Sequence, residues 1–380
     1  DMKTHKKIRS YSGHEHGISS VRFSPNGKYL VSVGFKHDKQ MMLHEWEIDR
    51  LVCIEKMENK VNALCFHDSG EFFVTCGDRH LKWWYFVCND PDDKSSVTGL
   101  NGRPASILKA QQDSNFVDVA CCTKTTGGGD TSAIFCTTSS GMLCLIHEKR
   151  LMDKWVQLDS SASYCLTLTP SFIIVGGTCG DVFVINPESL EFVTTLPHSV
   201  PLTSTPKVNI GETGGGGDLE FAACYGVASI PTTTCVAVLY ADRSVFIWDI
   251  ADIHNPIKFK SFVFHKACIW DLVFIEQISK NQSVKGLLSD EPDSESSSAD
   301  LGNTSLPPGT FATCGADNSV CFWNLDPKMQ RKSKWKSSYS RDLLHSFQLD
   351  NSGNGTPNSK GREVVDGSPP DIELPDRQQV

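Results

Sequence analysis

An aspartate followed six residues later by a tryptophan recurs along this chain of 380 residues, and this recurrence constrains the fold more than any other feature. The clear copies are Asp78 to Trp84, Asp242 to Trp248 and Asp317 to Trp323. A fourth copy, Asp38 to Trp46, has two extra residues in the turn. Self-similarity at a spacing of tens of residues is typical of chains built from stacked units of one kind. The sequence therefore predicts a repeat architecture.

Two more segments keep the spacing but lose both the aspartate and the tryptophan, namely Ser140 to Ile146 and Cys179 to Ile185. Two of the five intervals between successive copies are close to the ~40 residues of a four-stranded repeat. The other three are longer, and composition turns polar near residues 89–104, 197–218 and 276–308. Long polar stretches of this kind are typical of loops, so we interpret these three as inserts.

Within a repeat, the apolar residues follow the two-residue period of strands. Residues 18–23 alternate, Ser24-Pro25-Asn26-Gly27 has turn composition, and residues 29–33 and 41–46 then continue the pattern. The scheme recurs in residues 61–66, 72–75 and 81–86, and no segment has a sustained helical apolar stripe. We therefore predict an all-β fold with about six repeat units of four strands.

Composition excludes several classes of protein. The formal net charge is −9 and the pI is about 5.7. That balance argues against a general nucleic-acid-binding surface, which needs a basic face. The apolar runs fall far short of the ~20 residues that span a bilayer, so we expect no membrane segment. The 15 cysteines are scattered singly in apolar runs without a CxxC pair, which favours reduced thiols in the cytosol.

Motifs that carry chemistry are missing. The glycine runs at 127–129 and 214–217 lack the Lys and Ser/Thr of a phosphate loop, and there is no HExxH and no GxSxG. We therefore predict no catalytic, cofactor-binding or metal-binding residue, no cofactor, and a protein that is not an enzyme.

Several motifs resemble WD repeats, the units of β-propellers: Gly13-His14, the turn at residues 24–27, and Trp248-Asp249 after the aspartate. The resemblance implies a structural hydrogen-bond network in each blade, formed by a His, a Ser or Thr, the turn Asp and the Trp. The implied residues are His14, Ser32, Asp38 and Trp46; Thr75, Asp78 and Trp84, without a matching His; Asp242 and Trp248; and His265, Thr313, Asp317 and Trp323.

A closer resemblance covers most of the chain. Residues 29–34, 73–84, 138–144, 150–156 and 319–324 are similar to the mitogen-activated-protein-kinase-binding WD-repeat scaffolds, a family that includes a spindle-pole protein linked to brain size. The resemblance implies a longer tandem propeller, with residues 1–12 ending a preceding blade, 13–350 forming the propeller and 351–380 a polar linker toward a second one. Six repeats plus one strand would leave one flank of the propeller open.

The same resemblance implies a non-enzymatic scaffold that organises JNK-type MAP kinase signalling, spindle-pole or centrosome assembly, or both. The implied partners are JNK-type kinases, spindle-pole or centrosomal proteins and, less directly, microtubules. The implied localisation is cytoplasmic, at the cytoskeleton, spindle pole or centrosome.

Two alternatives stay open. One is a microtubule-associated WD-repeat protein that binds tubulin directly. The other is a ubiquitin-ligase substrate receptor, a class that commonly has Trp-Asp-x-Arg at the end of a third strand. Here the residues after the tryptophans are Asp249-Ile250-Ala251 and Asn324-Leu325-Asp326, without the Arg.

Overall fold

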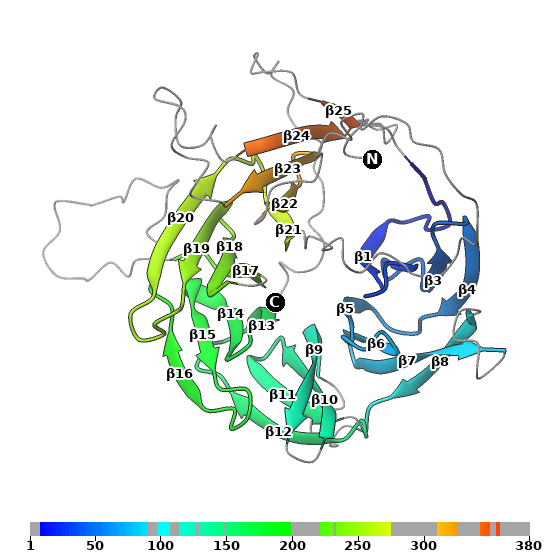
Figure 1. The fold of residues 1–380 in the computed structure, drawn as a ribbon, viewed down its shortest axis with the longest axis horizontal. Helices are drawn as coiled ribbons and strands as arrows, with labels where there is room; N and C mark the ends of the chain where they lie inside the picture. Colours follow the sequence, from blue (N-terminus) through cyan, green and yellow to red (C-terminus); the bar gives the residue numbers. More distant parts are fainter. Residues whose placement is uncertain are drawn as a thin grey trace, which may run out of the picture. The chain divides into compact units, whose positions relative to one another are not determined.

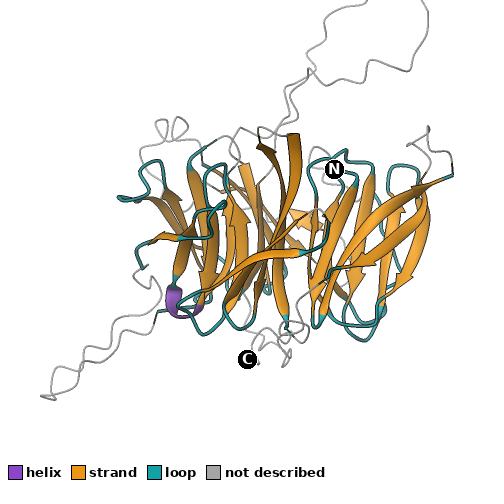
Figure 2. Cartoon of the chain, turned by 90° about the horizontal axis from the view of Figure 1, so that it is seen from below, coloured by secondary structure: helices purple, strands orange, loops and turns teal. Residues whose placement is uncertain are grey.

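The computed structural model describes residues 8–89, 97–106, 114–126, 129–147, 149–198, 221–230, 233–274, 310–325, 343–349 and 355–357. These residues are strands and loops, apart from the 3-10 turn η2 (Thr178–Gly180), which is purple in Figure 2. They form six antiparallel sheets, and each sheet begins with four strands that neighbour one another in chain order. The fold is therefore the all-β, six-bladed β-propeller class that the sequence predicts.

The first three blades contain twelve strands. They are β1 (Ile18–Phe23), β2 (Tyr29–Gly34), β3 (Gln40–Glu45) and β4 (Arg50–Lys56); β5 (Val61–Phe66), β6 (Phe72–Gly77), β7 (His80–Cys88) and β8 (Val97–Pro104); and β9 (Phe116–Thr126), β10 (Gly129–Thr138), β11 (Met142–His147) and β12 (Met152–Gln157).

The last three blades follow the same plan. They are β13 (Ser163–Leu168), β14 (Ile173–Gly177), β15 (Val182–Ile185) and β16 (Phe192–Thr195); β17 (Cys224–Ser229), β18 (Cys235–Tyr240), β19 (Ser244–Asp249) and β20 (Ile257–Val263); and β21 (Ile269–Phe274), β22 (Thr310–Gly315), β23 (Ser319–Asn324) and β24 (Leu343–Leu349). The sixth blade has a fifth strand, β25 (Gly355–Pro357), paired with β24.

The six blades fall into two compact units. The larger unit contains residues 11–229 and 234–263, with blades one to five, and the smaller unit contains the sixth blade. Within the larger unit the first strands of neighbouring blades contact one another, in the order β1, β5, β9, β13 and β17, as Figure 1 shows. In the larger unit the first strand of each blade is therefore its inner strand, and the fourth is its outer strand; the equivalent strands of the sixth blade take the same names.

The apolar core of the larger unit lies between successive blades. Its strands supply Val31, Leu43 and Phe73 between blades one and two, and Ile134, Cys136 and Trp83 between blades two and three, all fully buried. Similar clusters lie between blades three and four and between blades four and five. Second and third strands are covered on both faces, which is why they read as continuous apolar runs.

The inner strand of every blade has a register shift at the same place in its pairing with the second strand. The residues that the shift leaves unpaired are Ser19, Asn62, Val117, Tyr164, Tyr225 and Trp270. A bulge re-aims the side chain that it carries and tightens the local twist. Because the bulge recurs in all six blades, the repeats are equivalent at the level of single residues, including the two degraded copies.

The first blade differs from the others on its inner strand. Ile18 and Phe23 are 47% and 55% exposed, whereas the equivalent residues of β5, Val61 and Phe66, are 3% and 9% exposed. On β5 these side chains pack against the preceding blade. Within the larger unit, β1 therefore carries an uncovered apolar flank of the kind expected for a first blade.

One predicted insert is wrong in part. Residues 97–104 belong to β8, the outer strand of the second blade, and not to a loop. The sequence Thr98-Gly99-Leu100-Asn101-Gly102 has turn composition because an outer strand has one half-exposed face and needs few β-branched residues. Most of the other two predicted inserts, residues 199–218 and 276–308, lies outside the described residues.

The predicted domain limits stay predictions. Residues 8–12 form no strand, and residues 1–7 lie outside the described residues. Of the predicted linker 351–380, only residues 355–357 are described, as β25.

Candidate functional site

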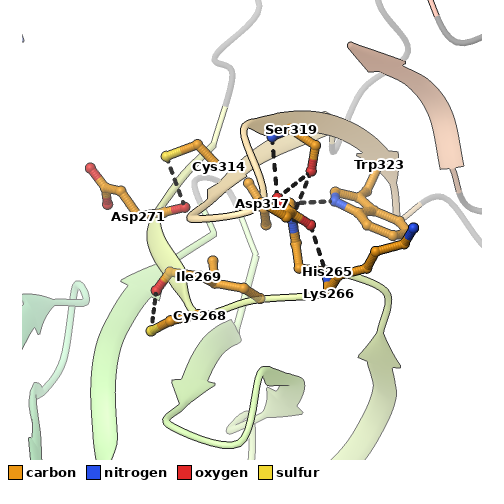
Figure 3. A network of polar contacts seen from close by, with 10 residues as sticks. His265, Lys266, Cys268, Ile269, Asp271, Cys314, Asp317, Ser319 and Trp323 are labelled. Atoms are coloured by element: carbon orange, nitrogen blue, oxygen red, sulfur yellow. Dashed lines mark hydrogen bonds and ion pairs between the residues drawn. The ribbon is translucent and has the colours of Figure 1, made fainter. Parts of the chain in front are cut away.

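The sixth blade contains a complete network of the predicted kind (Figure 3). The Trp323 indole Nε1 donates to Thr313 Oγ1 at 2.8 Å, and His265 Nε2 lies 2.8 Å from the same hydroxyl. His265 Nδ1 lies 3.1 Å from Asp317 Oδ1. An indole only donates and a carboxylate only accepts, so the bonds run in one direction, from Trp323 through Thr313 and His265 to Asp317.

Asp317 is also bound by its own turn. Ser319 Oγ donates to Asp317 Oδ1 at 2.6 Å, and the Lys266 backbone N–H donates to Oδ2 at 2.9 Å. Burial acts to raise the pKa of Asp317, but the hydrogen bonds from His265, Ser319 and Lys266 outweigh it and hold that pKa well below its usual value. The network therefore fixes the carboxylate in its charged form.

Gly315 makes room for this arrangement. A Cβ on Gly315 would lie 2.6 Å from His265 Nδ1 and 2.8 Å from Asp317 Oδ1. Gly34 has the same position in the first blade, where a Cβ would lie 2.6 Å from His14 Nδ1. The end of the second strand must therefore be glycine wherever a His and an Asp close over it.

The His, Asp and Ser of the sixth blade have the residue types of a hydrolase triad, but their arrangement does not suit catalysis. His265 is 2% exposed, and its Nε2 faces Thr313 and Trp323 inside the sheet. The Ser319 hydroxyl donates to the carboxylate and is not poised toward a substrate. A nucleophile needs a base beside it and room for a substrate. The network is therefore structural.

The second blade builds a shorter network from a different histidine. Trp84 Nε1 donates to Thr75 Oγ1 at 2.8 Å, and His80 Nε2 lies 2.8 Å from that hydroxyl. Burial, followed by the charge of Lys82, lowers the pKa of His80 to about 4. Asp78 takes no part in this network. Its carboxylate lies 3.9 Å from Arg79 at the surface. His80 was missed because it lies on the third strand, two residues after the turn aspartate.

The first blade corrects one prediction. His14 Nε2 lies 3.0 Å from Ser32 Oγ, and Asp38 Oδ1 accepts from the backbone N–H groups of Glu15 and His16. Trp46 lies beyond the end of β3, and its indole N–H donates to the Gly27 carbonyl, so its assignment to the network is wrong.

The position equivalent to Trp84 in the first blade is His44. His44 pairs with Leu30, as Trp84 pairs with Phe73, and it lies six residues after Asp38. It is 6% exposed and lies under the Tyr11 ring at 4.6 Å between centroids. Burial, followed by the nearby His14, lowers the pKa of His44. No extra residues are therefore present in this turn, and the spacing of six holds in every blade.

In the fifth blade only half of a network is present. Asp242 Oδ1 accepts from the backbone N–H and the hydroxyl of Ser244. Trp248 is 5% exposed and pairs with Val236, but the residue equivalent to Thr75 is Val238. Among the described residues the Trp248 indole N–H has no hydrogen-bond partner.

The third and fourth blades replace the network with apolar side chains. Ile146 and Ile185 take the position of the tryptophan, and Cys136 and Val175 take the position of the Ser or Thr. All four are fully buried. Since both partners of the hydrogen bond are replaced together, no buried donor is left without an acceptor at these positions.

The residue that follows the turn aspartate, or follows Ser140 and Cys179 in the degraded repeats, has a left-handed backbone in all six blades. Four of these residues are not glycine, namely Lys39, Arg79, Arg243 and Asn318, with φ between 47° and 73°. The two degraded repeats have Gly141 and Gly180 at this position, with φ of 78° and 77°. Asp242 and Asp317 accept the backbone N–H group two residues further on, across a non-glycine residue with a left-handed backbone. The turns of the two degraded repeats have no aspartate and use glycine at this position.

Side chains that take no part in the structural networks and could contact a partner lie at the end of the blades where the bulges occur. In the larger unit, the Tyr164 and Tyr225 rings meet edge to face at 5.3 Å, and the exposed Cys179 lies in the adjoining turn. Asn62 Nδ2 donates to Asn115 Oδ1 and Phe116 O of the next blade. This end of the larger unit is a polar and aromatic surface on a rigid support, which is typical of protein recognition.

The described residues hold no group of three or more His, Cys, Asp or Glu side chains placed to bind a metal ion. In the same part of the chain, no helix has the length and apolarity that crossing a membrane requires.

Comparison with known proteins supports the repeat assignment. The family "WD domain, G-beta repeat" matches residues 5–45 and 51–85. The chain is 29% identical over 376 residues to mouse mitogen-activated protein kinase-binding protein 1, covering 97% of this chain and 23% of that protein. It is 31% identical over 362 residues to mouse WD repeat-containing protein 62, covering 92% and 22%. The chain thus spans less than a quarter of the length of these relatives.

Proposed function

We propose, from the premise that this chain is a WD-repeat β-propeller with homologues named mitogen-activated protein kinase-binding protein 1 and WD repeat-containing protein 62, that it is a non-enzymatic protein-interaction scaffold. The observation that carries the proposal is how the polar groups of the blades are used. His265, Asp317 and Thr313 bond to one another inside a sheet, so the residue types with catalytic potential maintain the fold. The side chains at the bulges of the inner strands remain at the surface of the blade ends. Contacts that they make with a partner depend on shape and charge.

The signalling role of this scaffold is the organisation of JNK-type MAP kinases. Its support is that similarity to a protein named for MAP kinase binding extends over 97% of the chain, including the two degraded blades. We place the scaffold in the cytoplasm, at the spindle pole or centrosome, with proteins of those assemblies as further partners.

Proximity labelling in dividing cells tests this role. The 380-residue chain fused to a biotin ligase is compared with the ligase alone. We expect stronger labelling of JNK-type kinases and of centrosomal proteins with the fused chain. Identical labelling profiles for the two proteins would contradict the proposal.

The direct tubulin-binding alternative predicts a different result. The chain carries a formal charge of −9, and acidic tubulin tails repel an acidic partner. We therefore expect no saturable co-sedimentation of the purified chain with microtubules at physiological ionic strength. Saturable, salt-sensitive pelleting would favour the alternative.

A further inference from the structure

The outer strands of the third and fourth blades border a groove on the rim of the larger unit. One side is formed by Asp153 to Val156 of β12, and the other by Ser189 to Phe192, at the start of β16. The cavity between them measures about 540 Å³. Leu190 is 4% exposed and belongs to the core between the two blades, whereas Phe192 is 61% exposed. The groove therefore combines a buried apolar floor with an exposed aromatic side chain.

The far side of the groove is held rigid by the turn before β16. Asn186 Oδ1 accepts the backbone N–H groups of Glu188 and Ser189, and Leu190 has a left-handed backbone with φ of 60°. Lys154 crosses from the third blade, and its Nζ donates to the Glu188 carbonyl at 3.2 Å. A preformed wall costs little ordering free energy when a partner binds.

Among the residues that the structure describes, one edge of the groove is an open sheet edge. β12 is the terminal strand of its sheet. The Leu158 N–H bonds inward to Gly141 O, and residues of an antiparallel strand alternate between inward and outward backbone groups. By that alternation, the backbone N–H and C=O groups of Trp155 and Gln157 face outward. They are available to pair with an added strand.

Side chains on both faces of β12 would contact such a strand. Val156 pairs with Leu143, which faces the fourth blade, and Trp155 pairs with Cys144, which faces the second blade. Trp155 is 51% exposed. A strand added beside β12 would therefore place alternate side chains against Phe192 and Val156 on one face and against Trp155 on the other.

The charge of the groove selects its occupant. Two carboxylates line it, those of Asp153 and Glu191, and Glu188 belongs to the adjoining turn. The one ammonium group in the lining is that of Lys154, which already bonds to the Glu188 carbonyl. Asp153 lies 3.1 Å from His147. An acidic rim around apolar side chains is complementary to a basic peptide with apolar anchors.

The same chain already pairs an extra strand with an outer edge. In the sixth blade β25 lies antiparallel to β24, with Phe347 opposite Pro357 and Leu349 opposite Gly355. An outer strand of this fold therefore accepts a fifth strand.

We propose that the groove between β12 and β16 binds an extended, basic peptide segment of a partner protein, which adds to the β12 edge as a fifth strand and anchors apolar side chains on Phe192 and Trp155. This proposal rests on the interaction role proposed above, but not on the identity of the kinase.

Fluorescence anisotropy with the full chain tests the proposal. The probe is the fluorescein-labelled peptide Lys-Arg-Val-Phe-Val-Arg-Lys. We expect saturable binding that weakens at least about fivefold in Phe192→Ala and in Trp155→Ala, as is typical of exposed aromatic anchors. The double variant Glu188→Lys/Glu191→Lys should weaken it about tenfold, and so should a rise in salt. A peptide with N-methyl groups along one edge should bind far less, because it cannot extend the sheet.

The matched control is Phe259→Ala on the outer strand of the fifth blade, where the ring is 41% exposed between Lys258 and Lys260. It should leave the affinity unchanged. Equal weakening by Phe259→Ala, unchanged binding of the N-methyl peptide, or no saturable binding would each overturn the proposal. Dimerisation of the chain without peptide that Trp155→Ala abolishes would also overturn it, in favour of a second copy. These binding measurements do not depend on whether JNK-type kinases are labelled in cells. The peptide-binding proposal and the proposed signalling role can therefore fail independently of each other.

Discussion

The sixth and the fourth blades fold to the same plan with opposite chemistry at one buried position. In the sixth blade Trp323 bonds to Thr313, and a histidine and an aspartate continue the chain of hydrogen bonds. In the fourth blade Ile185 and Val175 take the equivalent positions and make apolar contacts only. The comparison teaches that the position must be filled, and that either a complete network or a complete apolar pair fills it without leaving a buried polar group unsatisfied.

The fifth blade lies between these two solutions. It keeps Trp248 but has Val238 in place of the hydroxyl, so among the described residues the indole N–H remains unpartnered. A buried donor without an acceptor costs about 1–3 kcal/mol. If the comparison holds, this blade contains a local defect that one substitution can repair.

The largest expected effect is the pH dependence of the second blade. The pKa of His80 is lowered to about 4 from an ordinary value of 6.5. Its contribution to stability is therefore complete above about pH 6.5 and is lost as the pH falls toward 4, because the unfolded chain takes up the proton first. We expect about 2 kcal/mol less unfolding free energy at pH 5 than at pH 7 from this residue.

Urea denaturation at both pH values measures the effect, and His80→Gln is the control because glutamine does not titrate. Burial also lowers the pKa values of His14 and His44, so the informative quantity is the difference between wild type and this variant. An identical pH dependence for both proteins would contradict the account.

The next effect concerns the hydroxyl of the second blade. Thr75→Val removes the acceptor of Trp84 and the partner of His80, and should lower the unfolding free energy by about 2 kcal/mol. The matched control is Thr137→Val in the third blade, where the Oγ1 is fully buried without a partner among the described residues. That change should be neutral or stabilising, and a comparable loss from both would refute the comparison.

The reverse exchange in the fifth blade should have the opposite sign. Val238→Thr places a hydroxyl where Thr75 and Thr313 have theirs and gives the Trp248 indole an acceptor. We expect a gain of about 1 kcal/mol in thermal or urea denaturation. Destabilisation of more than that amount would indicate that Trp248 does not occupy the equivalent place.

The smallest effect is expected at the turn of the second blade. Arg79→Gly relieves a left-handed backbone, with φ of 47°, and should stabilise the chain by about 0.5 kcal/mol. Gly141→Ala is the converse change in a degraded repeat, where φ is 78° and the new Cβ would lie 2.5 Å from Ser160 O. It should destabilise the chain by at least about 1 kcal/mol, as differential scanning calorimetry would detect.

Much of the fold could be predicted because each repeat keeps the same six-residue interval between its turn residue and the buried residue of its third strand. The interval between Asp317 and Trp323 sets the turn and the third strand together, and apolar alternation sets the faces. The degraded repeats could be found as well, since Ile146 and Ile185 keep the apolar register after the polar pair is gone.

The individual networks could not be predicted fully, because a hydrogen bond depends on which side chain reaches a buried hydroxyl. His80 reaches Thr75 from the third strand, whereas His265 reaches Thr313 from the loop before the inner strand. In the first blade His44 occupies the position that a tryptophan has in other blades. The sequence predicts Trp46 instead, because it is the nearest tryptophan after Asp38. The outer strand β8 was missed because its composition is that of a turn.

The indole N–H resonances of the protein labelled with ¹⁵N-tryptophan test the central claim most directly, namely that Trp84, Trp248 and Trp323 occupy equivalent positions and differ in their partners. We predict that Thr75→Val and Thr313→Val each shift one strongly downfield indole resonance and speed its exchange with solvent. Val238→Thr should move one further resonance downfield. Spectra in which Thr75→Val and Thr313→Val leave every indole resonance in place would contradict the account.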